Sequence, residues 1–311
     1  MTVEQSSSSP TTIRSRGPRS PKRRGTQHRR SIAVFIAPFA TLFFFLYLLP
    51  IGYAFWQSLL VIRRDGTYGK AHEVFGGLSQ YSLVFHNEAF WKSMARMGLF
   101  GIVQVPIMLG LALVFALLLD SSLLKGRRFF RLAFFVPYAV PGVIAAIMWG
   151  NLLSPNLSPF KSITSRVDLL GANLVLWSIA NVITWIYVGY NMLIIYSSLL
   201  SIPTELYEAA RLDGAGQLRI AWSVKIPLAR PAILMTAVFS IIGTLQLLAE
   251  PQVFQSFSSA VTSTFTPNMT VYATASVPNT NLAAAISVVL ALITFVLSFT
   301  FLRFTQRKGT A

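Results

Sequence analysis

The sequence contains no cysteine, few histidines and few charged side chains. Charged residues make up 12% of the 311 positions and hydrophobic residues 54%, whereas soluble domains carry about twice that charged fraction. The missing cysteines exclude disulfides, thiolate metal sites and a cysteine nucleophile. The three histidines (His28, His72, His86) lie outside the apolar runs, which argues against a histidine metal site. The composition predicts an integral membrane protein without a large soluble domain.

The net charge of +16 raises nucleic acid as a possible partner, but its distribution argues against that. Lys and Arg are concentrated in a tail and in short loops between apolar runs, which is typical of membrane proteins rather than of nucleic-acid-binding surfaces. Residues 1–30 are rich in Ser, Pro and Arg, and this composition predicts a disordered, basic tail that faces the cytoplasm. A nuclear-localisation signal at residues 22–24 is the minor alternative.

Six apolar runs follow, each long enough to cross a bilayer. They cover residues 31–60, 95–119, 130–153, 172–200, 231–249 and 281–302. The first run is too long for a signal-peptide core and lacks a small-residue cleavage site, so we expect the chain to retain it. With a cytoplasmic tail, the inner side holds most of the 26 Lys and Arg residues. The positive-inside rule therefore predicts six crossings with both termini in the cytoplasm.

These runs give a simple division of the chain. After the tail, residues 31–94 form a first transmembrane helix and an outer loop. Residues 95–303 form the transmembrane core, which includes a cytoplasmic loop at 201–231, and residues 304–311 form a short cytoplasmic tail. Prolines interrupt three of the runs (Pro38, Pro50, Pro106, Pro137, Pro141). Because proline frees backbone carbonyls that neighbouring helices or water must satisfy, we expect kinked helices around a cavity.

The cytoplasmic loop at 201–231 carries helix signals although it is polar. Ser201 or Thr204 can cap a helix, Pro203 suits a first turn, and two glutamates favour the positive end of the helix. Strong helix formers follow up to residue 212, and Gly214 then predicts a break. A second short segment runs from residue 218 to the prolines at 227 and 231. By composition alone, an ordered loop that only joins two spans is equally compatible.

The same loop resembles the EAA loop of permease subunits in ATP-binding-cassette (ABC) importers. The matching residues are Glu208, Ala209, Ala210, Asp213, Gly214, Ala215 and Pro227. Two positions depart from the pattern, since Ala221 stands where Phe is common and Leu218 where Trp is frequent. Short strings at residues 77–81, 135–141 and 202–207 are similar to the carbohydrate-uptake branch of this family, the maltose or glycerol-phosphate type.

The resemblance implies an all-α, multi-pass protein with six transmembrane helices in a permease bundle of the bacterial plasma membrane. It implies as partners a second, non-identical permease subunit, two copies of a cytoplasmic ATPase and an extracytoplasmic solute-binding protein. The chain has no phosphate-binding loop motif, so ATP and Mg would bind to the ATPase. This subunit would then be no enzyme and bind no cofactor.

The resemblance also implies a role for each loop residue. Glu208 would be the charged contact to the ATPase, Ala209 and Ala210 would allow close approach, Asp213 would stabilise the turn, and Gly214 would permit it.

Polar side chains deep in the apolar runs indicate a path for the solute. Such residues are costly in a bilayer unless they face a cavity or a partner. In the fourth run Thr184, Tyr187 and Asn191 share one helical face. Further candidates are Ser240, Gly243 and Thr244 in the fifth run and Trp149 in the third. Sugars bind to aromatic faces and neutral hydrogen-bonding groups, so we predict a sugar or a sugar derivative as the solute.

Other interpretations of these residues stay open. The same residue types stabilise helix contacts and interfacial belts. We interpret Glu250 as a solvated charge in an outer loop at 250–280 rather than as a residue that lines the outer mouth of the path. A permease for a non-sugar solute would use the same architecture. A membrane-embedded enzyme, such as a lipid-modifying transferase, would need ionisable residues in the spans, which are nearly absent. A structural or assembly protein would not require the motif-matched loop.

Overall fold

The computed structural model describes residues 24–66, 70–121, 124–276 and 279–307. The chain divides into two compact units, Met1–Tyr53 and Ala54–Ala311. Most of the predicted disordered tail lies outside the described residues. The first described helix begins at Arg24, so the end of that tail is helical rather than disordered.

The described part of the first unit, from Arg24 onwards, is one helical segment. It comprises α1 (Arg24–Phe43), the π-helical turn η1 (Phe44–Leu48) and the start of α2 (Leu49–Gln57). The apolar stretch Val34–Gln57 is long enough to cross a membrane. The helix continues past Pro38, and the wide π-turn η1 lies just before Pro50. Proline has no N–H group, so a regular α-helix would lose one backbone hydrogen bond at Pro50. The π-turn is a local change in the hydrogen-bond pattern next to this position.

The second unit begins with a feature that the prediction of an all-α protein missed. Strands β1 (Leu60–Arg64) and β2 (Ala71–Phe75) form an antiparallel hairpin in which Leu60 pairs with Phe75. Leu60, Val61 and Ile62 are β-branched or apolar, so they suit a pleated strand. The predicted outer loop after the first span is therefore partly ordered.

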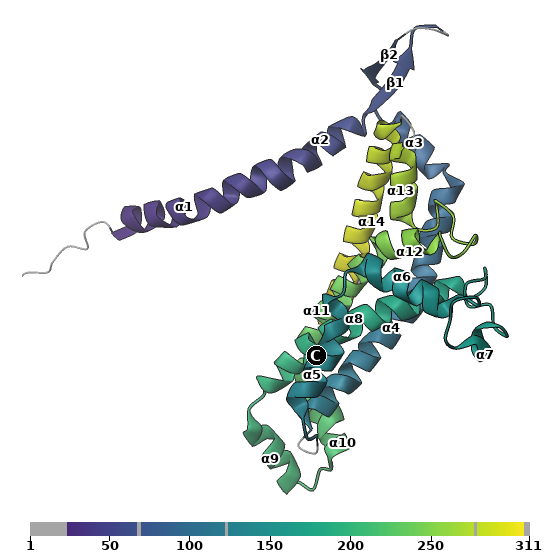
Figure 1. Ribbon diagram of the computed structural model, residues 1–311. Coiled ribbons are helices and arrows are strands. Elements are labelled where there is room, and N and C mark those ends of the chain that lie inside the picture. Colours follow the sequence, from purple (N-terminus) through teal and green to yellow (C-terminus); the bar gives the residue numbers. More distant parts are fainter. Residues whose placement is uncertain (1–23, 67–69, 122–123, 277–278, 308–311) are drawn as a thin grey trace, which may run out of the picture. The chain divides into compact units, whose positions relative to one another are not determined.

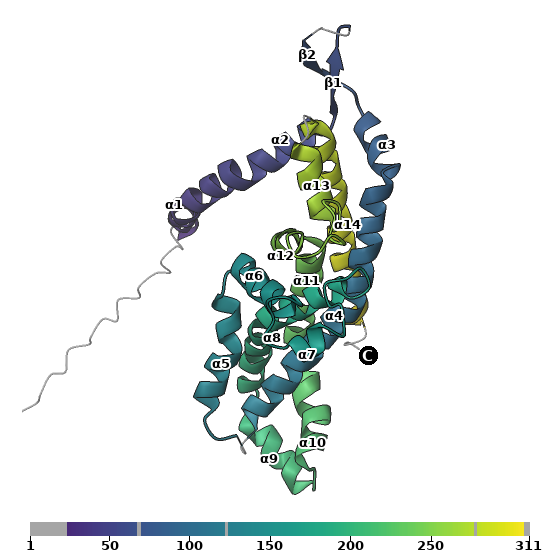
Figure 2. The same cartoon turned by 45° about the vertical axis from the view of Figure 1, so that its right-hand side comes forward.

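The rest of the second unit is helical (Figures 1 and 2). In chain order, the helices are α3 (Ser79–Phe85), α4 (Glu88–Asp120), α5 (Arg127–Ala139), α6 (Gly142–Leu153), α7 (Lys161–Thr164), α8 (Val175–Leu200), α9 (Thr204–Leu212), α10 (Gln217–Ile220), the π-turn η2 (Ala221–Lys225), α11 (Ile226–Leu245), α12 (Ala249–Phe254), α13 (Pro267–Ser276) and α14 (Thr280–Arg307). In both views the hairpin and the α9–α10 segment lie at opposite ends of this unit.

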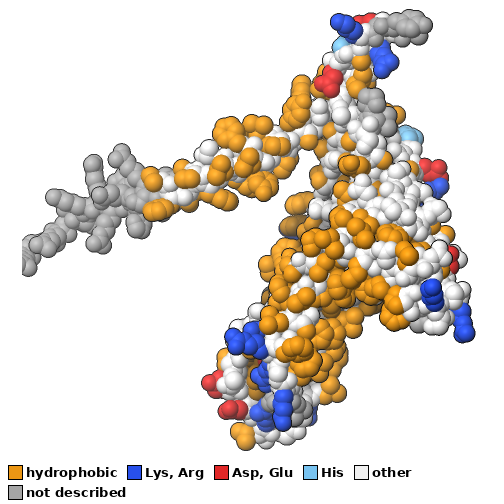
Figure 3. Space-filling view, viewed as in Figure 1, with side chains coloured by type: hydrophobic (Ala, Val, Ile, Leu, Met, Phe, Trp, Pro, Cys, Tyr) orange, Lys and Arg blue, Asp and Glu red, His pale blue; other side chains and the backbone are white. Residues whose placement is uncertain are grey.

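Among the described residues, five helical segments are long and apolar enough to cross a membrane, and a sixth counts if α5 and α6 form one bent span. These two helices meet at 96°, inside the run predicted at 130–153. The break follows from the sequence, because Pro141 forces Val140 into an extended conformation and then caps α6. Charged side chains lie at both ends of the second unit and along the flank near α7, and apolar side chains cover much of the surface between the ends (Figure 3).

Helix α8 is at the centre of the packing. It contacts α4, α5, α6 and α11 and contributes Ile179, Val182 and Ile186 to a buried cluster. Its closest approach to α5 is at Gly189, where an added Cβ would lie 1.8 Å from the carbonyl oxygen of Phe134. Glycine is required there because two helix backbones touch. This packing fixes the relative positions of the helices around the candidate site.

Candidate functional site

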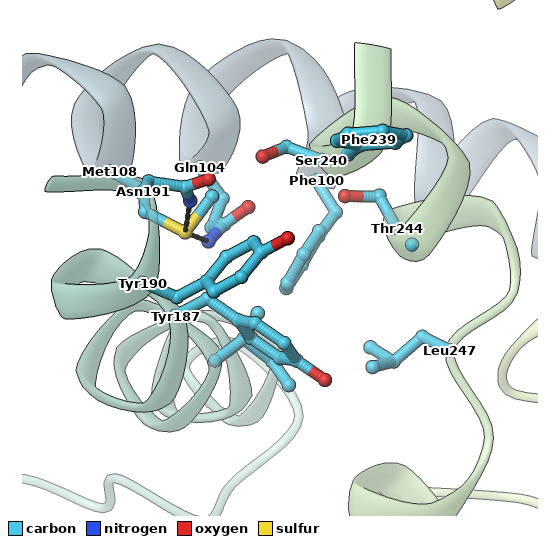
Figure 4. Close-up of a pocket in the computed structure, with 12 residues that line it drawn as sticks. Phe100, Gln104, Met108, Tyr187, Tyr190, Asn191, Phe239, Ser240, Thr244 and Leu247 are labelled. Carbon is cyan, nitrogen blue, oxygen red and sulfur yellow. Dashed lines mark hydrogen bonds between the residues drawn. The ribbon is translucent and has the colours of Figure 1, made fainter. Parts of the chain in front are cut away.

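A cavity of about 140 Å³ lies between α4, α8 and α11 (Figure 4). Its lining residues are Phe100, Gln104, Met108, Ile183, Tyr187, Tyr190, Asn191, Phe239, Ser240, Gly243, Thr244 and Leu247. None of these side chains is charged. Tyr187, Phe239 and Gly243 are exposed, so the cavity is open on one side of this chain.

Two buried amides converge on one sulfur atom at the wall of the cavity. The Gln104 Nε2 group donates to Met108 Sδ at 3.4 Å and to Thr184 Oγ1 at 3.2 Å. Asn191 Nδ2 donates to the same sulfur at 3.6 Å, as Figure 4 shows. Gln104 Oε1 is buried and has no hydrogen-bond partner among the described residues. A buried, unpaired acceptor is costly, and a hydroxyl group in the cavity would satisfy it.

Aromatic rings form a further part of the cavity wall. Tyr190 projects from α8 towards Ser240 and Thr244 of α11, and Tyr187 projects towards Leu247 (Figure 4). Tyr138, at the end of α5, stacks on Tyr190 with ring centres 4.7 Å apart and meets Tyr187 edge-on at 5.9 Å. The three rings fix one another, so the cavity presents rigid aromatic surface beside hydroxyl and amide groups.

At one end of the second unit, α9 and α10 form a second distinctive structure, which we call the knuckle (residues 204–220). Gly214 ends α9 with φ of +79°. The Ala215 N–H donates to the Ala210 carbonyl and the Gly214 N–H to the Arg211 carbonyl, the two bonds of a Schellman cap. Only glycine adopts this conformation without strain. The predicted glycine break is therefore confirmed.

The start of the knuckle and the segment that follows it differ from the sequence prediction. Pro203, rather than Ser201 or Thr204, is the N-cap residue of α9, and no side chain caps the helix. The prolines do not end the second segment, because the helix continues from Gln217 to Leu245. Pro227 falls in the first turn of α11, directly after η2, where a missing N–H is tolerated.

The knuckle is exposed. Glu208, Ala209, Asp213 and Gly214 are all accessible, and Ala210 and Ala215 are half-buried. Large apolar side chains lie exposed beside them, with Leu212 at 89% and Leu218 at 75%. Exposed apolar side chains among charged ones are typical of a surface that binds another protein.

The sequence pattern of one protein family, the "binding-protein-dependent transport system inner membrane component", matches residues 108–308, which include most of the cavity and the whole knuckle. The chain belongs to this family. It is therefore a permease subunit of an ABC importer and not an enzyme.

Curated relatives agree with this assignment. The permease is 30% identical over 236 residues to the lactose transport system permease protein LacF of Rhizobium radiobacter, covering 72% of this chain and 79% of the relative. It is 31% identical to the trehalose/maltose permease protein MalF of Thermococcus litoralis, over 68% of this chain and 72% of that one. It is 28% identical to the sn-glycerol-3-phosphate permease protein UgpA of Agrobacterium fabrum, over 63% of this chain and 67% of that one.

A solved structure shares the fold. A chain of a bacterial ABC transporter for the acidic polysaccharide alginate superimposes with a TM-score of 0.74 at 16% sequence identity, covering 90% of this chain and 96% of that chain.

The structure brings most of the predicted path residues of the permease together. Tyr187, Asn191, Ser240, Gly243 and Thr244 all line the cavity. Thr184 does not line it, but accepts a hydrogen bond from Gln104, which does. Trp149 does not line it either, because it packs in the core edge-on against Trp185 at 6.0 Å. Sequence reasoning missed the contribution of α4, although Gln104 is a polar residue inside an apolar run.

Glu250 does not have the predicted solvated position. Its run, predicted as an outer loop, contains α12 and α13, and the Glu250 side chain is buried in α12 against α6. An added Cβ on Gly142 would lie 2.2 Å from Glu250 Oε1. Burial raises the pKa of this carboxyl group. The sequence gives no local sign of this contact, because the two residues belong to different helices.

Metal chemistry receives no support from the described part of the chain. It contains no cluster of three or more His, Asp or Glu side chains that could hold a metal ion.

Proposed function

We propose that this permease translocates a neutral sugar or oligosaccharide into the cell, driven by ATP hydrolysis on a partner subunit. The observation that carries the proposal is the cavity, whose wall combines two tyrosine rings with amide and hydroxyl groups and has no charged side chain. Tyrosine rings bury the apolar faces of a sugar, and the polar groups exchange hydrogen bonds with its hydroxyls. The lactose and trehalose/maltose permeases among the relatives support the same solute class.

The open side of the cavity supports a second, non-identical permease subunit as the partner that completes it. Exposed Tyr187 and Phe239 border this opening, and aromatic side chains are enriched at protein interfaces. The proposed complex also contains two copies of a cytoplasmic ATPase, which binds ATP and Mg, and an extracytoplasmic solute-binding protein. This chain then holds no cofactor itself.

We further propose that α5 and α6 count as one crossing, which gives six spans with both termini in the cytoplasm. The positive-inside distribution of Lys and Arg supports this orientation. The hairpin and the knuckle lie at opposite ends of the second unit, as expected for segments on opposite sides of a bilayer. The knuckle then faces the cytoplasm, where Glu208 and the small residues Ala209 and Ala210 contact the ATPase.

The solute class is tested in proteoliposomes that contain the complete importer and its binding protein. Uptake is measured for maltose, lactose and trehalose, for sn-glycerol 3-phosphate, for an alginate oligosaccharide and for an amino acid mixture. ATP-dependent uptake confined to one or more neutral sugars is the expected result. Uptake of the phosphorylated or acidic solutes alone would contradict the proposal, because the cavity wall offers them no cation.

A further inference from the structure

A buried ion pair joins the end of α4 to the turn that follows the knuckle. Asp120 is the last residue of α4, and Lys225, which is 105 positions away, is the last residue of η2. Their side chains are 11% and 10% exposed, and Lys225 Nζ donates to Asp120 Oδ2. By contrast, Lys92 and Glu88 form an ion pair at the surface.

Tyr207 of α9 connects this pair to the knuckle. The Lys225 ammonium group lies 5.1 Å from the centre of the Tyr207 ring, a cation–π contact. The Tyr207 hydroxyl donates to the Leu199 carbonyl at 3.4 Å, and burial together with the nearby Asp120 charge raises the pKa of Tyr207. Tyr207 directly precedes Glu208, so the ion pair contacts the same short helix that carries the residue that we propose as the ATPase contact.

Stability is a poor explanation for this arrangement. Removing two charges from water costs free energy that their attraction rarely exceeds, and an apolar pair of similar volume is often at least as stable. Lys225 reaches its partner from a π-turn, a rare element that is frequent at functional sites. The expected benefit of the pair is therefore a defined geometry between two segments.

The segments near this pair belong to helices that line the cavity. Helix α8 carries Tyr187 and Asn191 and continues through residues 201–203 into α9. Helix α4 carries Gln104 and Met108 and ends at Asp120. The chain itself connects the knuckle to α8 at one end and, through η2, to α11 at the other. The ion pair adds a connection to α4.

We propose that Asp120, Lys225 and Tyr207 form a charge latch that makes α4 move together with the knuckle. A displacement of α9 by the ATPase then reaches α4 directly, whereas without the latch it reaches α4 only through the packing of α4 on α8 and α11. All three are positioning residues and touch neither solute nor nucleotide. The inference rests on the proposed docking of the knuckle on the ATPase.

The test uses the complete importer in proteoliposomes and compares Asp120→Asn, Lys225→Met and the exchanged pair Asp120→Lys with Lys225→Asp. The chain offers a matched control, Glu88→Gln, which breaks an ion pair that is exposed to solvent. Three quantities are measured for each variant: the amount of assembled complex, the rate of ATP hydrolysis and the number of solute molecules imported per ATP hydrolysed.

We expect each single latch variant to assemble and hydrolyse ATP but to import about tenfold less solute per ATP, because one buried charge loses its partner. The exchanged pair should recover most of that loss, and Glu88→Gln should match the unchanged protein. Tyr207→Phe should keep the ratio and Tyr207→Leu should lower it, since the ring face contacts the ammonium group.

Two results would overturn the latch. One is an unchanged import-to-hydrolysis ratio in both single variants. The other is a loss of assembled complex that the exchanged pair does not restore, because the pair would then serve folding alone. Failure of the docking proposal is recognised separately, since Glu208→Lys would then leave ATPase binding unchanged whatever the latch variants do.

Discussion

The cavity and the knuckle obtain their shapes in different ways. The cavity is bounded by long helices whose backbones touch, as Gly189 and Phe134 show, so its shape depends on packing over many residues. The knuckle is short and exposed, and its shape depends on a glycine cap, while one buried ion pair lies just beyond its end. Changes at the helix contacts that hold the cavity walls in place should therefore destabilise the whole protein, whereas changes in the knuckle should damage coupling and leave the folded permease intact.

Gly189→Ala should have the largest effect on stability, because it changes the helix packing behind the cavity and leaves the knuckle unchanged. Its Cβ would lie 1.8 Å from the Phe134 carbonyl oxygen, so α5 and α8 must separate. We expect a loss of about 2 kcal/mol or more in unfolding free energy, as for overpacked cores. Thermal unfolding of the purified complex measures it.

Gly110→Ala in α4 is the matched control, because an added Cβ there meets no atom within 4 Å. Alanine is the better helix former by about 1 kcal/mol, so this variant should be no less stable than the unchanged protein. Equal stability of the two variants would show that the close approach of α5 and α8 does not contribute to the free energy of unfolding.

Gly214→Ala should have a smaller effect that is confined to the knuckle. A side chain at a φ of +79° costs about 1–2 kcal/mol, which weakens the Schellman cap. ATPase binding to the permease should fall several-fold while the melting temperature of the membrane core stays unchanged. Binding is measured by co-purification of the ATPase at increasing salt.

Gly216→Ala tests whether this effect depends on backbone conformation. Gly216 lies in the same loop but has a φ of −70° and open space around its Cα, so alanine fits without strain. Wild-type ATPase binding is expected. If both glycine variants bind the ATPase equally weakly, the left-handed turn is not the cause.

Gly243→Ala should have the smallest effect, and it should be on transport alone. This residue lines the cavity, and an added Cβ meets nothing within 4 Å, so stability should not fall. The added methyl group narrows the cavity, and uptake of a trisaccharide should decrease more than uptake of a monosaccharide. The ratio of the two initial uptake rates is the measurement, and an unchanged ratio would place the solute path elsewhere.

Local patterns in the sequence predicted much of this architecture. The apolar runs coincide with the long helices, Pro141 marks the bend between α5 and α6, and Gly214 marks the end of α9. The helical spacing of Tyr187 and Asn191 placed both on the cavity side of α8. These features depend on residues that are near one another in the chain, so the sequence contains enough information to infer them.

Features that depend on distant contacts were missed. Glu250 is buried because Gly142, in another helix, leaves room for its carboxyl group. Asp120 and Lys225 are both polar residues near helix ends, and no local pattern shows that they pair. The hairpin was overlooked because its short strands follow directly on an apolar run.

The most direct test of the account is charge reversal at the exposed Glu208. Glu208→Lys should abolish ATP-dependent uptake and reduce ATPase binding, while membrane insertion and the amount of permease stay normal, since this side chain supports no packing in the described structure. Uptake and ATPase co-purification are measured in the same membranes. Wild-type uptake by this variant would contradict the claim that the knuckle couples the ATPase to the cavity.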